Sequence, residues 1–165
     1  MHEMELIGVR VEMPTNAPMV LLRERAGEGR TVPIYIGAPE ATAIALALDG
    51  VDTPRPMTHD LLRDILEELA ADVERIVVTD LHDKTFFAEI HLRHGGEAHI
   101  ISSRPSDAIA LAARTGTPIF VETSVIDDVG FTDSDDEEDD AAPAEEVVEE
   151  FKEFLDNINP EDFED

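Results

Sequence analysis

Alternating apolar and polar residues run through much of the first 130 positions of this chain and predict β-strands. In a strand, such alternation places one set of side chains on the buried face of a sheet and the other on its exposed face. Several runs are joined by only two or three turn-forming residues, which favours antiparallel neighbours. The predicted strands cover residues 4–13, 20–24, 31–36, 74–81, 85–93, 97–102 and 117–121.

Three segments with helical patterns interrupt these strands. Residues 40–48 are apolar and rich in alanine, which suits a central helix, and residues 58–71 are amphipathic. A third helix is predicted between Ser106 as N-cap and Gly116 as C-terminal stop, and Thr58 is the expected N-cap of the second helix. The pattern therefore predicts an α+β fold, an antiparallel or mixed sheet with about three packed helices.

A short sequence, AIALA, occurs twice in the predicted helices, at residues 43–47 and 108–112. Each copy follows a strand and a turn that contains proline. The match indicates either an internal duplication or a chance similarity between alanine-rich helices. A duplication would place Glu40 and Asp107 at equivalent helix starts.

Charge separates a domain, residues 1–131, from an acidic extension. Residues 1–131 hold 11 Lys and Arg against 22 Asp and Glu, whereas residues 132–165 hold 1 against 17. Residues 132–144 form a linker that is too acidic to bury and is expected to be disordered. Residues 145–165 predict an acidic amphipathic helix that docks on the domain, a neighbouring subunit or another protein. The alternative is an unfolded tail that only increases solubility.

Composition excludes several classes of protein. The chain has no cysteine, so disulfides and Cys-based zinc sites are absent. No apolar segment has the length of a membrane span and the N-terminal residues do not match a signal peptide, so we expect a soluble, cytoplasmic protein without membrane partners. The net charge of −27 opposes nonspecific binding of nucleic acid. The very apolar strands and helices lead us to expect a homo-oligomer, a dimer or larger.

Polar side chains gather at the starts of the three predicted helices and suggest an anion site. Arg–Pro pairs precede two of these helices, at Arg55 and Arg104. Guanidinium groups match the geometry of phosphate oxygens, and helix N-termini favour anions. Arg55, Arg104, Ser106 and Thr58 are therefore candidate phosphate-binding residues. The alternative is that Arg104 pairs with Asp107 while the hydroxyls only cap their helices.

The same helix starts carry acid–base and metal-ligating side chains. Imidazole side chains can exchange protons near neutral pH, so His59 is a candidate for proton transfer. Adjacent helical residues point about 100° apart, so His59 is expected to find its partner on another helix rather than in Asp60. The carboxylates of Glu40, Asp60 and Asp107 suit a hard cation such as Mg²⁺ or Mn²⁺. The alternative is that these residues only complement the helix dipoles.

Four sequence blocks together resemble the bifunctional nuclease family over residues 4–128. They are PIYIG with the following Glu40–Ala41, PRPMTHDL, TFFAEI, and RPSDAIALAAR followed by TPIFV. The family is named for a plant member with ribonuclease and deoxyribonuclease activity. One position departs from it, because Ser102 stands where the family often has an acid.

The resemblance implies a metal-assisted nuclease that hydrolyses RNA or single-stranded DNA. In that role His59, Asp60, Asp107 and Glu40 are the catalytic candidates, with the three carboxylates holding a cation or water and His59 transferring a proton. The acidic composition instead favours a non-catalytic module that binds an anion or another protein. Both hypotheses use the same polar residues.

Removal of residues 132–165 tests the role of the acidic extension. If the domain has a nucleic-acid site, we expect the shortened protein to bind nucleic acid more tightly or cleave it faster, most visibly at low salt, because the lost carboxylates repel phosphate within a Debye length of roughly 10 Å at 0.1 M salt. If residues 145–165 dock on the domain, the melting temperature or the mass of the oligomer changes instead. Equal affinity at low salt would contradict the electrostatic role.

Overall fold

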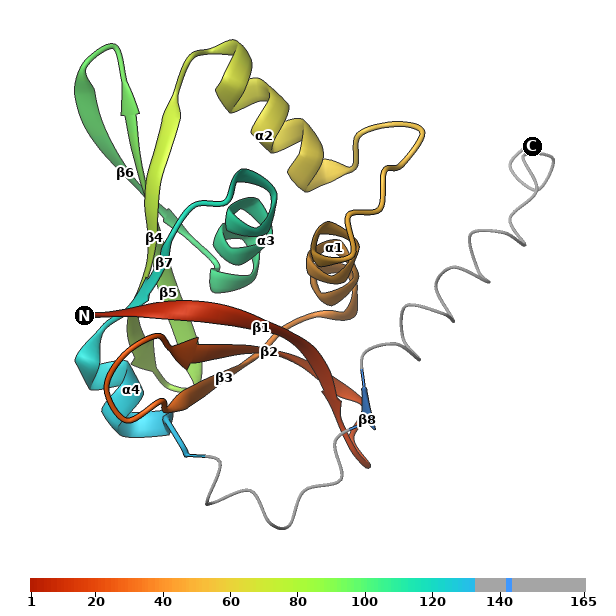
Figure 1. Ribbon diagram of the computed structural model, residues 1–165, viewed down its shortest axis with the longest axis vertical. Helices are drawn as coiled ribbons and strands as arrows, with labels where there is room; N and C mark the ends of the chain where they lie inside the picture. The colour runs from red at the N-terminus through yellow and green to blue at the C-terminus, as the bar shows by residue number, and fades with distance from the viewer. Residues whose placement is uncertain (133–141, 144–165) are drawn as a thin grey trace, which may run out of the picture.

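A computed structural model describes residues 1–132 and 142–143 and has the expected α+β fold. The first seven strands are β1 (His2–Glu12), β2 (Ala17–Glu24), β3 (Thr31–Tyr35), β4 (Asp72–His82), β5 (Thr85–His94), β6 (Glu97–Ser103) and β7 (Ile119–Val121). The helices in the described ranges are α1 (Ala38–Leu48), α2 (Thr58–Glu68), α3 (Pro105–Thr115) and α4 (Thr123–Val129). The strands form one mixed sheet in the order β3-β2-β1-β7-β4-β5-β6 (Figure 1).

The sheet consists of two similar halves joined by β7. In the first half, β1, β2 and β3 are antiparallel and lead into α1; in the second half, β4, β5 and β6 are antiparallel and lead into α3. β7 is antiparallel to β1 and parallel to β4, so it connects the two meanders. The same order of elements therefore occurs twice along the chain.

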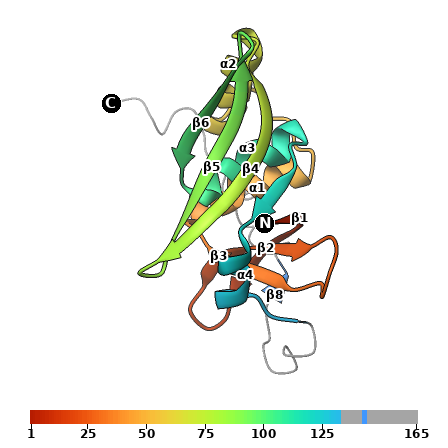
Figure 2. The ribbon, with the colours of Figure 1, turned by 90° about the vertical axis from the view of Figure 1, so that its left-hand side faces the viewer.

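The core lies between this sheet and the helices α1 and α3. Small side chains allow these two helices to pack closely, and Ala41, Ala108 and Ala110 are all buried. Ile109 and Ile76 are fully buried at the contact of α3 with the second half of the sheet. In Figure 2 the strands β4, β5 and β6 lie in front of α2 and α3, which shows that these helices occupy one side of that half.

The two predicted N-caps are wrong. Arg104, not Ser106, is the N-cap of α3, because Pro105 takes the first helical position, where its missing N–H removes no hydrogen bond. Met57, not Thr58, is the N-cap of α2. The Asp60 carboxylate accepts a hydrogen bond from the Met57 N–H at 3.0 Å and so stabilises this start.

The helix α2 buries only part of its apolar face. Leu62 and Leu66 pack against the core, whereas Leu61, Ile65 and Leu69 are 50%, 47% and 58% exposed. The reason is that α2 packs mainly on α3 rather than on the sheet. The expected homo-oligomer stays a prediction.

Two short elements were not expected from the sequence. The helix α4 is only seven residues long, too short for its periodicity to stand out. A two-residue strand, β8 (Ala142–Pro143), pairs with β1 at Arg10 and Val11 within the linker predicted to be disordered. There β7 no longer covers β1, so the free backbone groups of β1 can accept another strand. The helix expected at 145–165 lies outside the described residues.

No helix in the described part of the chain is long and apolar enough to cross a membrane.

We expect the substitution Ile109→Ala to lower the free energy of unfolding by about 3 kcal/mol, because it opens a cavity between α3 and the sheet. The matched control is Ile100→Ala on β6, which is 60% exposed and should change this free energy by less than about 0.5 kcal/mol. Denaturant unfolding of both variants measures the difference, and equal losses would contradict this description of the core.

Candidate functional site

The side chain of Arg104 connects the starts of α1 and α3. Its Nε and Nη2 donate to the two Asp107 carboxylate oxygens at 2.7 and 2.9 Å, and Nη2 also lies 3.1 Å from Glu40 Oε1. Glu40 and Asp107 are each the third residue of their helix, α1 and α3 respectively. The expected pairing of Arg104 with Asp107 is therefore present. Arg104 remains 65% exposed, and no described residue accepts from its Nη1, so two N–H groups stay available to a ligand.

His59 is held by Asp107 from a different helix, as the sequence predicts. His59 Nε2 and Asp107 Oδ1 lie 3.0 Å apart, and His59 is only 9% exposed. An ionised carboxylate only accepts hydrogen bonds, so a neutral His59 carries its proton on Nε2 and has its lone pair on Nδ1. The contact thus orients the ring and leaves Nδ1 as the basic atom.

The pKa of the Asp107 carboxyl is lowered. Burial alone raises its pKa, but the hydrogen bonds from Arg104 and His59 together outweigh that effect. Asp107 is therefore a carboxylate at neutral pH, able to accept from both partners.

Asp60, next to His59 at the start of α2, forms a separate ion pair with Arg114 near the end of α3. Arg114 Nε donates to Asp60 Oδ1 at 2.5 Å, and the Arg114 side chain is 5% exposed. Burial raises the pKa of Asp60, but the hydrogen bonds from Arg114 and from the Met57 N–H lower it below its ordinary value. Asp60 and His59 thus reach different parts of α3, which agrees with their expected divergence.

Within residues 1–132 and 142–143, the acidic side chains at the helix starts are not gathered into a metal centre. Among the described residues, no group of three His, Asp or Glu side chains is placed to hold a metal ion. Glu40 and Asp107 share Arg104, while Asp60 is paired with Arg114. The expected set of Glu40, Asp60 and Asp107 is therefore divided between two arginines.

A cleft lies beside Arg104, with a volume of about 370 Å³. Its walls are the end of β3 and the following loop, the turn between β4 and β5, and the start of α3, which are represented by Ile34–Gly37, Lys84–Phe86 and Arg104–Ser106. Of the predicted phosphate-binding residues, Arg104 and Ser106 line this cleft, and Arg55 and Thr58 do not. The cleft brings together three of the four sequence blocks noted above.

Several site residues were missed by the sequence analysis. Lys84 and Tyr35 line the cleft, and Arg114 supports the start of α2. Gly37 leaves space for the Glu40 carboxylate, because a Cβ there would displace that carboxylate from its present position. The sequence places Lys84 in a short turn between two predicted strands. Only the folded sheet brings this turn into the same cleft as Arg104.

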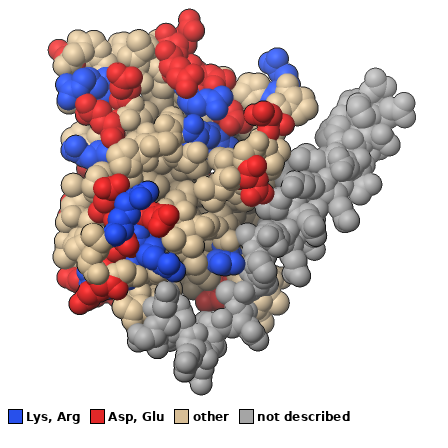
Figure 3. Space-filling view, in the orientation of Figure 1, with Lys and Arg blue, Asp and Glu red and all other residues tan. Residues whose placement is uncertain are grey.

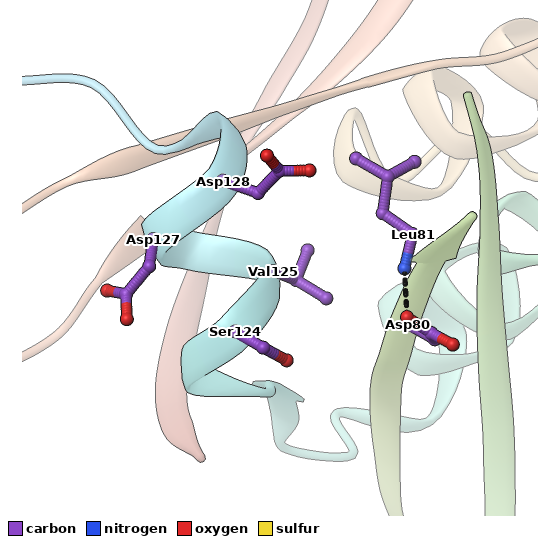
Figure 4. Close-up of a pocket in the computed structure, with 6 residues that line it drawn as sticks. All are labelled: Asp80, Leu81, Ser124, Val125, Asp127 and Asp128. Atoms are coloured by element: carbon purple, nitrogen blue, oxygen red, sulfur yellow. Dashed lines mark hydrogen bonds between the residues drawn. The ribbon is translucent and has the colours of Figure 1, made fainter. Parts of the chain in front are cut away.

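A second hollow, between β4 and α4, has the opposite electrostatic character. It is lined by Asp80, Asp127 and Asp128 together with Leu81, Ser124 and Val125 (Figure 4). The Asp80 carboxylate accepts from the Leu81 N–H at 2.8 Å, and Asp127 binds Arg30 outside the hollow. Three carboxylates repel phosphate, so this hollow does not suit a nucleic-acid backbone.

The molecular surface mixes both signs of charge. On the face shown in Figure 3, basic side chains lie beside acidic ones rather than in a large basic patch. An extended basic track for duplex nucleic acid is absent from this face. On this face, a local cationic site such as the cleft suits an anion better than the surrounding surface does.

The lowered pKa of Asp107 gives a prediction for acid stability. A carboxyl whose pKa is lower in the folded state stabilises the fold above its unfolded pKa, and this contribution disappears as the pH falls through the folded pKa. We expect Asp107→Asn to be less stable than the parent at pH 7 and the difference to shrink below about pH 4. The control Asp72→Asn changes an exposed residue. Urea unfolding from pH 7 to 2.5 measures the effect, and a difference independent of pH would contradict it.

Comparison with known proteins supplies the family. A family model described as the bifunctional nuclease domain matches residues 20–134. An uncharacterized protein of Mycobacterium tuberculosis is 45% identical over 165 residues, which cover 99% of this chain and 98% of that protein. Bifunctional nuclease 2 of Arabidopsis thaliana is 29% identical over 114 residues, 66% of this chain and 35% of the plant protein. Bifunctional nuclease 1 of the same plant is 28% identical over 107 residues, which cover 63% of this chain and 33% of that plant protein.

The chain spans about a third of these plant proteins, and the family model covers more than half of the chain. The chain therefore belongs to the bifunctional nuclease domain family.

Proposed function

We propose that this protein is a nuclease that cleaves phosphodiester bonds in RNA or single-stranded DNA. The observation that carries the proposal is the connected network of His59, Asp107, Arg104 and Glu40 at the starts of three helices. It combines a proton-transfer group with a partly exposed guanidinium. The plant relatives named bifunctional nucleases support the same class of activity.

In this proposal Asp107 orients His59, and His59 Nδ1 accepts a proton from the attacking water or, in RNA, from the ribose 2′-hydroxyl. The attacking oxygen forms a new P–O bond while the P–O bond to the leaving oxygen breaks, and the leaving oxygen takes up a proton from water. Arg104 binds a phosphate oxygen through its free Nη1 donors and stabilises the charge that develops on the phosphate. Glu40 lies 3.1 Å from the same Nη2 that donates to Asp107, so the two carboxylates together fix the guanidinium and leave Nη1 for the phosphate. Asp60 acts through position only, because its bond to Arg114 sets the start of α2.

The proposed reaction does not pass through a protein-built metal site, since the carboxylates are paired with arginines. The requirement for Mg²⁺ or Mn²⁺ stays a prediction. It is tested by running each cleavage assay with Mg²⁺, with Mn²⁺ and with EDTA.

Cleavage of labelled single-stranded RNA and DNA by highly purified protein tests the nuclease proposal. We expect His59→Gln to lower the rate by about 10²-fold or more, because the proton acceptor is lost. The matched control is His91→Gln, since His91 is similarly shielded, with 14% side-chain exposure, and pairs with Glu89 at 3.0 Å away from the cleft. Equal rates for the parent and both variants would indicate a contaminating nuclease and overturn the proposal.

One observation favours a second candidate, a non-catalytic module that binds an anion. His59 is 9% exposed and hydrogen-bonded to Asp107, which suits a histidine that orders the helix starts, because little of its ring is accessible to a substrate. Such a module binds the labelled strands without cleaving them under any metal condition. Binding without cleavage would therefore favour this candidate.

A further inference from the structure

The cleft beside Arg104 has features that the network of His59 and Asp107 does not use. It contains a second cation, an unpaired hydroxyl and an aromatic ring, from Lys84, Ser106 and Tyr35. Its volume of about 370 Å³ lies in the usual range of small-ligand sites. A ligand in this cleft can reach Arg104 through Nη1, the nitrogen that neither carboxylate partner uses.

The start of α3 provides hydrogen-bond donors that face an anion. Pro105 has no N–H, and no side chain caps this helix, so the next backbone N–H groups lack a helical partner. Ser106 is 6% exposed and lines the cleft, yet no described residue is hydrogen-bonded to its hydroxyl. Although most of this residue is buried, its hydroxyl oxygen reaches solvent in the cleft, where it can donate to a ligand. Together with Arg104 Nη1, these donors suit a phosphate group.

Lys84 adds positive charge at the opposite wall of the cleft. It has no ion-pair partner in the described part of the chain, although acidic residues are abundant there. Its backbone φ is +61°, and that of the preceding Asp83 is +48°, in the two-residue turn between β4 and β5. Glycine is the favoured residue at the second position of such a turn. A lysine there costs stability that a glycine would not, which points to a role for its ammonium group.

Tyr35 presents a flat ring at the end of β3. It is 53% exposed, and its hydroxyl donates to Glu12 Oε1 at 2.8 Å, so one end of the ring is held in place. An exposed aromatic ring beside two cations is the arrangement with which proteins stack an unpaired base next to its phosphate. A paired base in a duplex is already stacked and does not present its face in this way.

We infer that this cleft is the binding subsite for one unpaired nucleotide, with its phosphate on Ser106, Arg104 and Lys84 and its base on Tyr35. The inference rests on the proposed function and assigns the place where one nucleotide of the proposed single-stranded substrate is held. It makes Tyr35 and Lys84 specificity-determining residues, whereas His59 and Asp107 carry the proposed chemistry. Binding at the cleft does not require that chemistry to occur.

The tyrosine itself provides the measurement. Tyr35 is the single tyrosine of the chain and there is no tryptophan, so the intrinsic fluorescence of the full protein reports on this ring. The probe is a phosphorothioate-linked tetrathymidylate, which resists cleavage. We expect it to quench the tyrosine emission at low salt, with inorganic phosphate and a self-complementary duplex binding at least about tenfold more weakly.

Two variants separate the charge from the ring. Lys84→Gly removes the cation while relieving the backbone, so we expect an unchanged or higher melting temperature with about fivefold weaker binding of the tetrathymidylate. The slope of log K against log salt concentration should become less steep by about 0.7 in this variant, because one phosphate contact is lost. Tyr35→Leu should weaken binding about tenfold, measured by anisotropy of a dye-labelled probe, and Tyr35→Phe should retain most of the affinity.

The outcomes distinguish this inference from the nuclease proposal. It is overturned by an unquenched tyrosine at saturating probe, by unchanged affinity in Lys84→Gly, or by equal affinity for the duplex. Cleavage without any response of Tyr35 would leave the nuclease and remove the nucleotide subsite. Quenching without cleavage would leave the subsite and remove the nuclease.

Discussion

The guanidinium group of Arg104 is the interaction on which the arrangement of the site depends. It binds Asp107 through two hydrogen bonds and lies 3.1 Å from Glu40. Both carboxylates are partly shielded from water, where an unpaired negative charge is costly and two neighbouring ones repel each other. The shared cation allows the starts of α1 and α3 to lie side by side, and it keeps Asp107 ionised as the partner of His59.

The two halves of the fold contribute differently to this junction. Each half runs through three antiparallel strands into a helix, and Glu40 and Asp107 occupy the same position in the two helices. The residues just before the helices differ: Gly37 leaves room for the Glu40 carboxylate, whereas Arg104 fills the equivalent position with a cation. An internal duplication, one of the two explanations of the repeated AIALA sequence, would produce this correspondence between the halves. The site depends on the difference between the halves rather than on their similarity.

Local charge, not net charge, determines what the cleft can bind. The chain carries a formal charge of −27, yet Glu40 and Asp107 are both paired with Arg104, and Lys84 has no ion-pair partner among the described residues. Because interactions between exposed charges are screened beyond roughly 10 Å at 0.1 M salt, the nearest groups dominate the potential in the cleft. The same argument makes the hollow at α4 unsuitable for phosphate, since its neighbours are aspartates. Acidic composition therefore weakens binding along the surface more than at this one point.

The sequence by itself determined the period of each long element, the order of strands and helices, and the collection of polar residues at helix starts. These features are local: alternation, helical spacing and turn residues act over a few positions. It also determined that His59 and Asp60 diverge. The tertiary structure alone decided that His59 meets Asp107, that Asp60 meets Arg114, and that Lys84 faces the start of α3. It likewise decided the central place of β7 and the pairing of β8. Such contacts join residues far apart in the chain, so they depend on how strands are ordered and helices cross, which no local pattern encodes.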